Sequence, residues 1–220
     1  MSPELEIGLI IFSMAAGAPF LIKLTQYTEH DIALGASLLL VLVLATCLYV
    51  PIVLPLLMPE ISVDGLQIFF TLVRQLIFPI ILGMLLDKFA PKITDAIQPW
   101  VAKLGGITLY IVIIGILVGE AEGVIQIFGE GAILLSVVFV LIVTAIGFFM
   151  GGKNDIDHLA DVGAVGTGQR NTSACMIIAS ANFAHIPEVL LIITIANTLG
   201  IVMLIFIAKY LSQDNHTERF

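Results

Sequence analysis

The sequence predicts an all-α polytopic membrane protein with seven transmembrane helices, two of them interrupted. Hydrophobic residues make up 59% of its 220 residues and charged residues only 12%, whereas soluble globular proteins are about half apolar and about one quarter charged. The apolar residues lie in long continuous runs, without the alternation that is typical of a membrane β-barrel strand. An ordinary soluble domain is therefore excluded, because its surface could not be covered with polar groups.

Each apolar run reaches the roughly 20 residues that a helix needs to cross a bilayer. Short polar segments, such as Glu29–Asp31 and Asp87–Lys88, separate the runs and leave no room for a soluble domain. We expect the spans at 5–27, 31–58, 66–86, 100–119, 131–151, 159–183 and 187–211.

The cations of the connections and the C-terminus all fall on one side of this topology: Lys23, Lys88, Lys92, Lys103, Lys153, Lys209 and Arg219. The positive-inside rule assigns that side to the cytoplasm. We expect an integral protein of the plasma (inner) membrane with the N-terminus outside and the C-terminus cytoplasmic. The net charge of -8 argues against nucleic acid as a partner, because phosphate binding needs clustered cations.

The sixth run carries a block of polar residues and glycines near the bilayer midplane: Gly166, Thr167, Gly168, Gln169, Arg170, Asn171, Thr172 and Ser173. An arginine at this depth costs about 2.5–3.5 kcal/mol on insertion scales, so the block must face protein or a watery cavity. Gly166 and Gly168 indicate that the backbone unwinds here and exposes amide groups to an ion or anion. A helix packing seam is the alternative, but it would need neither Arg170 nor its polar neighbours.

The first run contains a weaker interruption, formed by Gly17, Pro19 and Phe20 and followed by Lys23. Proline inside a helix removes a hydrogen bond, so we expect a kink or break near Gly17–Pro19. Lys23 is either an interfacial residue that reaches toward water or a ligand.

The two interruptions form a pattern. An interrupted span, a short loop and a plain span occur as spans one and two, and again as spans six and seven. The shift of five spans is odd, so the two copies cross the membrane in opposite senses. This is typical of secondary transporters, in which broken helices meet near the midplane and point their ends at the substrate.

Two other polar features have more than one interpretation. Arg74, within the third run, could be a site residue, pack against a partner or reach toward the interface. The segment Lys153–His158 contains metal-binding residue types, but no second ligand cluster occurs elsewhere, so we expect a solvated loop and no metal.

The break Ala15–Phe20 followed by Asp31-Ile-Ala-Leu, and Gly166–Ser173 opening a span, resemble the bile acid:sodium symporter family. The resemblance implies a ten-helix fold of two inverted repeats of five, divided into a core and a panel domain. It also implies secondary active transport of a small organic anion with Na⁺. It implies no resident cofactor and no enzymatic activity.

Laid on that fold, residues 1–60 correspond to the last two helices of the first repeat, in the core domain. Residues 61–220 correspond to the complete second repeat, with panel helices at 66–119 and core helices at 131–211. The chain would therefore hold two broken, crossing helices from an incomplete inverted repeat. Because three N-terminal helices have no counterpart, we expect either a partner chain or oligomer that supplies them, or a truncated fragment that does not transport.

The family's sodium ligands fall at Leu21, Ile22 and Gly166, which offer no side-chain oxygen, although Gln169 and Asn171 keep part of the pattern. We hypothesise that Arg170, with Lys23, replaces a bound cation and attracts the carboxylate or sulfonate of the substrate. Further hydrogen bonds would come from Thr167, Asn171, Thr172 and Ser173.

An intramembrane enzyme is the alternative from another class, with a serine such as Ser173 as nucleophile. Its base would be a histidine, but His30, His158 and His185 lie at span ends and none lies at the depth of Ser173. We therefore expect a transporter whose partners are its anionic substrate and the lipid bilayer.

Overall fold

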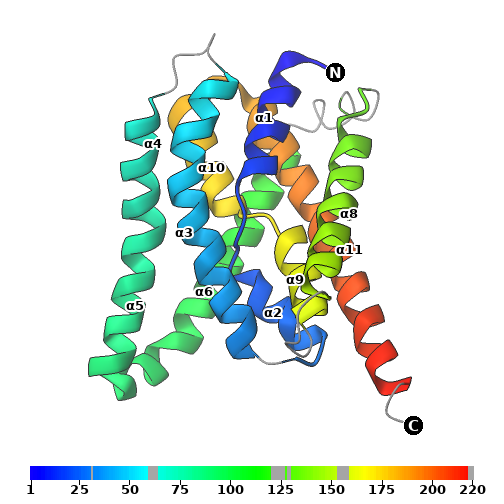
Figure 1. Ribbon diagram of the computed structural model, residues 1–220. Helices are drawn as coiled ribbons and strands as arrows, with labels where there is room; N and C mark the ends of the chain where they lie inside the picture. The colour runs from blue at the N-terminus through cyan, green and yellow to red at the C-terminus, as the bar shows by residue number, and fades with distance from the viewer. Residues whose placement is uncertain (31, 59–63, 120–126, 128–129, 153–158, 218–220) are drawn as a thin grey trace.

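The computed structural model describes the chain except for residues 31, 59–63, 120–126, 128–129, 153–158 and 218–220 (Figure 1). Throughout the described part, the regular elements are helices and no β-strand is formed, as predicted. They are α1 (Pro3–Met14), α2 (Phe20–Tyr27), α3 (Ile32–Leu57), α4 (Gly65–Leu72), the π-helix η1 (Val73–Ile77), α5 (Phe78–Phe89), α6 (Pro91–Gly119), α8 (Ala132–Gly151), α9 (Leu159–Gly168), α10 (Thr172–Asn182) and α11 (Pro187–Thr217).

Four of the described helices are long and apolar enough to cross a membrane: Ile32–Leu57, Gly65–Phe89, Ala132–Gly151 and Pro187–Ser212. Their outer faces carry large apolar side chains, including Leu56, Phe78 and Phe149, that are more than half exposed. Water would not stabilise so much exposed apolar surface, whereas lipid does. The chain is therefore an integral membrane protein.

Both predicted interruptions are present. Residues Ala15–Pro19 separate α1 from α2, and residues Gln169–Asn171 separate α9 from α10. The first break includes Gly17 at φ +79°, a backbone conformation that favours glycine. The two breaks therefore divide the first and sixth apolar runs into pairs of short helices.

Two helices extend beyond the predicted spans. Helix α6 begins at Pro91 rather than near residue 100, and α11 continues to Thr217 rather than ending near 211. Hydropathy marks only the apolar part of a helix, and the first turns of α6 are polar. Proline is also favourable in the first turn, where its missing N–H has no helical acceptor to lose.

The helices that carry the breaks are held by close packing in the bundle. Helix α8 packs along α9, α11 packs along α1, and α3 packs against α4. A Cβ atom on Gly147 would overlap with the Thr167 hydroxyl and the Gly163 carbonyl. Glycines at this interface therefore allow α8 and α9 to approach closely, which fixes the position of the second break.

Candidate functional site

The two breaks meet in the middle of the bundle. Figure 1 shows the extended segments between α1 and α2 and between α9 and α10 passing each other. Ala16 and Arg170 form an antiparallel β-bridge there. The backbone N–H of Asn171 donates to the Ala15 carbonyl at 3.0 Å. Interruptions more than 150 residues apart in sequence therefore form one site, which we call the crossing (residues 15–19 and 169–171).

Four helix ends point at the crossing. Helices α1 and α9 end there, and α2 and α10 begin there. A helix leaves carbonyls unpaired at its C-terminus and N–H groups unpaired at its N-terminus, with partial negative and positive charge respectively. The crossing therefore presents both kinds of partial charge in the interior of the protein.

Arg170 binds the C-terminal ends of both α1 and α9. Its Nε donates to the Phe12 carbonyl at 3.2 Å, its Nη1 donates to the Thr167 carbonyl at 3.2 Å, and its Nη2 donates to the Ser13 carbonyl. The guanidinium carbon also lies 5.4 Å from the centroid of the Phe139 ring. A single side chain thus closes two helix ends, a structural role that the sequence did not indicate.

The charge of Arg170 is not neutralised by a carboxylate of the described residues. The ion pair that these residues form joins His30 to Asp161 at 2.7 Å, away from the crossing. Arg170 is only 8% exposed, so carbonyl dipoles and an aromatic face are its observed counterparts. A buried cation without a counterion attracts an anion strongly.

Asn171 connects the second break to the first. Its side-chain nitrogen donates to the Gly17 carbonyl at 2.7 Å, and its side-chain oxygen accepts from the Ala174 amide at 3.0 Å. The second contact is an N-cap that satisfies an unpaired amide at the start of α10. Asn171 is fully buried, so it both begins α10 and ties it to the opposite break.

Gln169 holds a buried oxygen that has no hydrogen-bond partner within the described structure. Its side-chain nitrogen donates to the Arg170 carbonyl at 3.2 Å, whereas Oε1 accepts no hydrogen bond there. Buried polar atoms in native proteins almost always have a partner. An amide oxygen is a ligand that a hard cation such as Na⁺ accepts, so Gln169 Oε1 is the candidate cation ligand of the crossing.

Thr46 of α3 supports the first break, and sequence reasoning missed it. Its hydroxyl accepts from the Ala16 amide at 3.0 Å and donates to the Ala16 carbonyl at 2.9 Å. Nearby, a Cβ on Gly17 would lie 2.8 Å from the Val43 amide nitrogen, so the break lies directly on α3. The only signal in the sequence was one hydroxyl within a long apolar run.

The prediction that Gly166 and Gly168 unwind the backbone is wrong. Both residues lie inside α9, which ends at Gly168. A Cβ on Gly166 would overlap with Leu38, and one on Gly168 would overlap with Thr144. Their absent side chains allow close helix packing, and the break begins one residue later, at Gln169.

Of the remaining predicted site residues, Pro19 belongs to the crossing, and the others lie on the helices α2, α9 and α10 that border it. Thr167 donates to the carbonyls of Val143 and Gly163 and ties α9 to α8. Phe20 and Thr172 are partly buried; Pro19, Lys23 and Ser173 are exposed.

The segment Lys153–His158 lies outside the described residues. Among the residues that are described, no group of three or more His, Cys, Asp or Glu could hold a metal ion.

A mostly apolar cavity of about 270 Å³ lies between α1 and α8; Arg170 is not among its lining residues. Its lining includes Phe12, Ser13 and Phe139, the same residues that contact this side chain.

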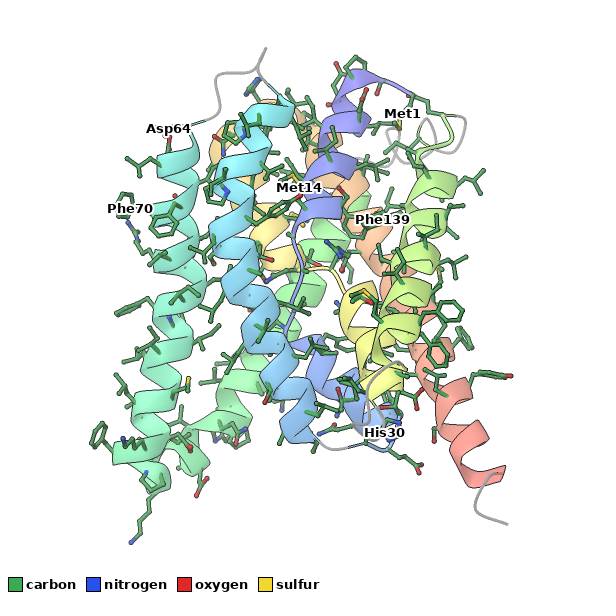
Figure 2. All side chains as sticks on the ribbon, viewed as in Figure 1. Met1, Met14, His30, Asp64, Phe70 and Phe139 are labelled. Atoms are coloured by element: carbon green, nitrogen blue, oxygen red, sulfur yellow. The ribbon has the colours of Figure 1, made fainter. Side chains whose placement is uncertain are left out.

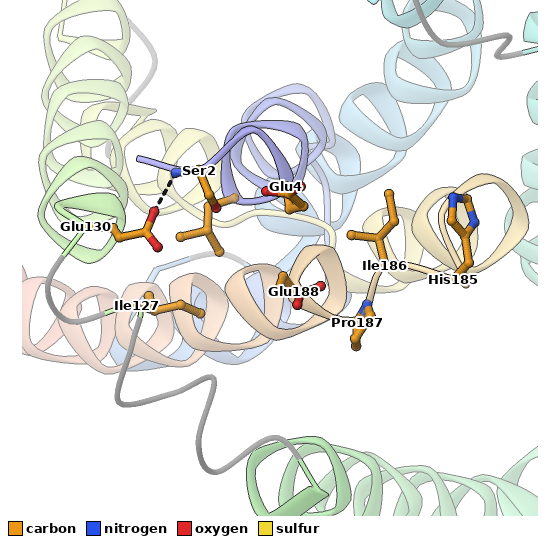
Figure 3. Close-up of a pocket in the computed structure, with 9 residues that line it drawn as sticks. Ser2, Glu4, Ile127, Glu130, His185, Ile186, Pro187 and Glu188 are labelled. Atoms are coloured by element: carbon orange, nitrogen blue, oxygen red, sulfur yellow. Dashed lines mark hydrogen bonds between the residues drawn. The ribbon is translucent and has the colours of Figure 1, made fainter.

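A larger cavity, of about 480 Å³, is lined by Glu4, Glu130 and Glu188 among others. Figure 3 shows it at the start of α1 and α11, where the Ser2 amide donates to Glu130. It therefore lies at one end of the bundle, and the smaller cavity is the one associated with the crossing.

A family model and a curated protein both match this chain. The model of the sodium bile acid symporter family matches residues 1–127, which include the first break but not the second. A protein described as "Probable sodium/metabolite cotransporter BASS5, chloroplastic" from Arabidopsis thaliana is 24% identical over 183 residues. That alignment covers 80% of this chain and 45% of the relative, so the chain spans less than half the length of the relative.

We predict that Thr46→Val destabilises the protein by about 1–3 kcal/mol, because it leaves the buried Ala16 peptide without hydrogen bonds while keeping the side-chain volume. The matched control is Thr194→Val, since the Thr194 hydroxyl is equally buried but donates only within its own helix, to Leu190. Thermal unfolding in detergent measures both. Equal losses for the two variants would contradict a special role of Thr46 at the crossing.

Proposed function

The chain belongs to the sodium bile acid symporter family, and from this premise we propose that it is a secondary active transporter of a small organic anion. The family model matches more than half of the chain, and the relative's name describes a sodium/metabolite cotransporter. The geometry of the crossing supports the same function, because broken helices that meet inside a bundle form substrate sites in transporters.

The observation that carries the proposal is the buried guanidinium of Arg170, which has no carboxylate partner in the described structure. Its hydrogen bonds occupy carbonyls at the negative ends of α1 and α9, and the anion would bind near the positive end of α10, where the Asn171 side chain caps the Ala174 amide. The hydroxyls of Thr172 and Ser173 lie in the first turn of α10. A carboxylate or sulfonate group would bind between these groups and Arg170.

The apolar part of the substrate would lie in the cavity between α1 and α8. The apolar part of the cavity lining comes from Met1, Leu9, Ile10, Phe12, Leu135 and Phe139, its polar part comes from Glu6, Ser13 and Ser136, and the cavity volume of about 270 Å³ fits a small organic molecule. The anion would thus have its charge at the crossing and its hydrocarbon part against the aromatic rings.

We further propose Na⁺ as the coupling ion, with Gln169 Oε1 as one ligand. The names of the family and of the relative both include sodium, and Gln169 Oε1 is the buried acceptor without a partner. Leu21, Ile22 and Gly166 offer no side-chain oxygen. The C-terminal carbonyls of α1, where another cation could bind, are occupied by Arg170.

In the proposed topology, each broken pair of helices makes one span, which gives seven spans in total. Residues 1–60 would be the last two helices of a first repeat, and residues 61–220 a second repeat with panel helices 66–119 and core helices 131–211. Transport would alternate access by moving the core against the panel.

We propose a plasma-membrane location with the N-terminus outside. Lys88 and Lys92 flank the joint between α5 and α6, and Lys209 lies near the end of α11. Figure 1 shows these three places at the same end of the bundle. The positive-inside rule assigns that end to the cytoplasm.

Two alternatives receive less support. A chain that spans less than half of its relative could be a piece that needs further polypeptide for transport. An intramembrane enzyme conflicts with membership of a transporter family, and the ring of His30 is bound to Asp161 rather than to a serine. Transport by the purified chain separates these readings.

We predict that proteoliposomes containing the chain accumulate labelled small carboxylates or sulfonates, and that Arg170→Gln lowers the uptake at least about tenfold. Arg170→Lys keeps the charge but not the planar fork, so it should retain part of the activity. The control is Lys88→Gln, which removes an exposed charge far from the crossing. Uptake by Arg170→Gln at the wild-type rate would remove this residue from the mechanism.

We predict that Gln169→Leu raises the Na⁺ concentration needed for half-maximal uptake at least about tenfold, because it removes the proposed ligand oxygen. The unfolding midpoint should fall as well, because leucine also lacks the side-chain nitrogen that donates to the buried Arg170 carbonyl at 3.2 Å. Uptake measured against Na⁺ and K⁺ gradients provides the comparison. The same Na⁺ dependence in both proteins would place the coupling site elsewhere.

A further inference from the structure

A row of polar side chains follows the outer side of the helix Gly65–Phe89, which α4, η1 and α5 form together. We call it the polar stripe; its members are Gln67, Thr71, Arg74 and Gln75. Thr71 is partly buried and the other three are exposed. Within the described part of the chain, Arg74 forms no hydrogen bond or ion pair.

Arg74 faces away from the packed side of this helix. The helix packs through Ile68, Leu72 and Leu76, which are at most 8% exposed, and α4 contacts α3. Arg74 lies two residues from both Leu72 and Leu76, which places it about 200° around the helix from each. Figure 2 shows Phe70, one turn before Arg74, pointing outward from the bundle.

Arg74 lies far from both ends of the helix Gly65–Phe89, which is long and apolar enough to cross a membrane. At 1.5 Å per residue, it is about 13 Å from Gly65 and about 22 Å from Phe89 along the helix axis. Arginines that reach the interface are found near helix ends, whereas Arg74 is more than two turns from either end. Exposed to lipid at this depth, its charge costs about 2.5–3.5 kcal/mol.

Near Arg74, the helix backbone also lacks one N–H donor. The Phe78 amide donates to the Val73 carbonyl in the wide turn of η1, and the next residue, Pro79, has no N–H to donate. A carbonyl one turn before Pro79 therefore loses its helical donor. Inside a bilayer each backbone polar group needs a hydrogen-bond partner. We therefore expect this carbonyl to accept a hydrogen bond from, and the Arg74 guanidinium to donate one to, groups outside the described structure.

We propose that the polar stripe docks a transmembrane helix of another polypeptide, which presents a carboxylate to Arg74 at mid-membrane depth. A second copy of this chain does not fit, because the carboxylates of its described helices lie within five residues of a helix end: Glu4, Glu6, Asp87, Asp95, Asp161, Glu188 and Asp214. The inference goes beyond the transport function and does not rest on it.

The test places a photo-crosslinking amino acid at Phe70, which flanks the stripe and is 61% exposed, in the full chain in its native membrane. The control position is Leu134 of α8, which is 68% exposed and has no polar stripe beside it. The expected adduct forms at position 70 and not at 134. Mass spectrometry should identify the attached peptide as an apolar segment of another polypeptide with Asp or Glu in its middle.

A charge exchange then tests the pairing itself. Arg74→Glu should lower the yield of the adduct at least about tenfold, and an Arg in place of the partner's carboxylate should restore it. Adducts only with lipid, adducts only with a second copy of the chain, or equal yields at positions 70 and 134 would each overturn the proposal. The comparison of positions 70 and 134 keeps Arg74 and decides the question even when an Arg74 variant does not accumulate.

Discussion

The structure depends on how helix ends are satisfied inside a membrane. Interrupting two helices leaves carbonyls and amides unpaired, and lipid offers them no partner. Here side chains of the second break supply hydrogen bonds to helix ends at both breaks. Arg170 donates to carbonyls at the ends of α1 and α9. Asn171 caps α10 and donates to the Gly17 carbonyl. Thr46 completes the network from α3. The other packing contacts hold these elements in register.

The same hydrogen-bond network determines which groups of the crossing stay available for a ligand. Arg170 uses three hydrogen bonds to hold the protein together, yet its charge stays without a carboxylate partner among the described residues. Gln169 keeps one oxygen unpaired. We propose that this positive charge and this acceptor bind an anion and Na⁺ together, as symport requires.

The sequence predicted both interruptions and the family because their signals are local. Pro19 and the polar run around Arg170 are exceptional in apolar surroundings, and the resemblance to the symporter family is confirmed. It could not predict Thr46, because a single hydroxyl in an apolar run carries no information about its partner. It misassigned Gly166 and Gly168, because a glycine favours both unwinding and close packing, and only neighbours such as Leu38 and Thr144 decide between them. The span count, the inverted repeat and the orientation stay predictions.

The central claim is that the two breaks are hydrogen-bonded to each other. Solid-state NMR in lipid tests it most directly, with ¹³C in alanine carbonyls and ¹⁵N in asparagine amides. The account predicts a dipolar coupling between the Asn171 amide and the Ala15 carbonyl at the separation of a hydrogen-bonded pair. Absence of that coupling, with the couplings of the helical asparagines intact, would contradict it.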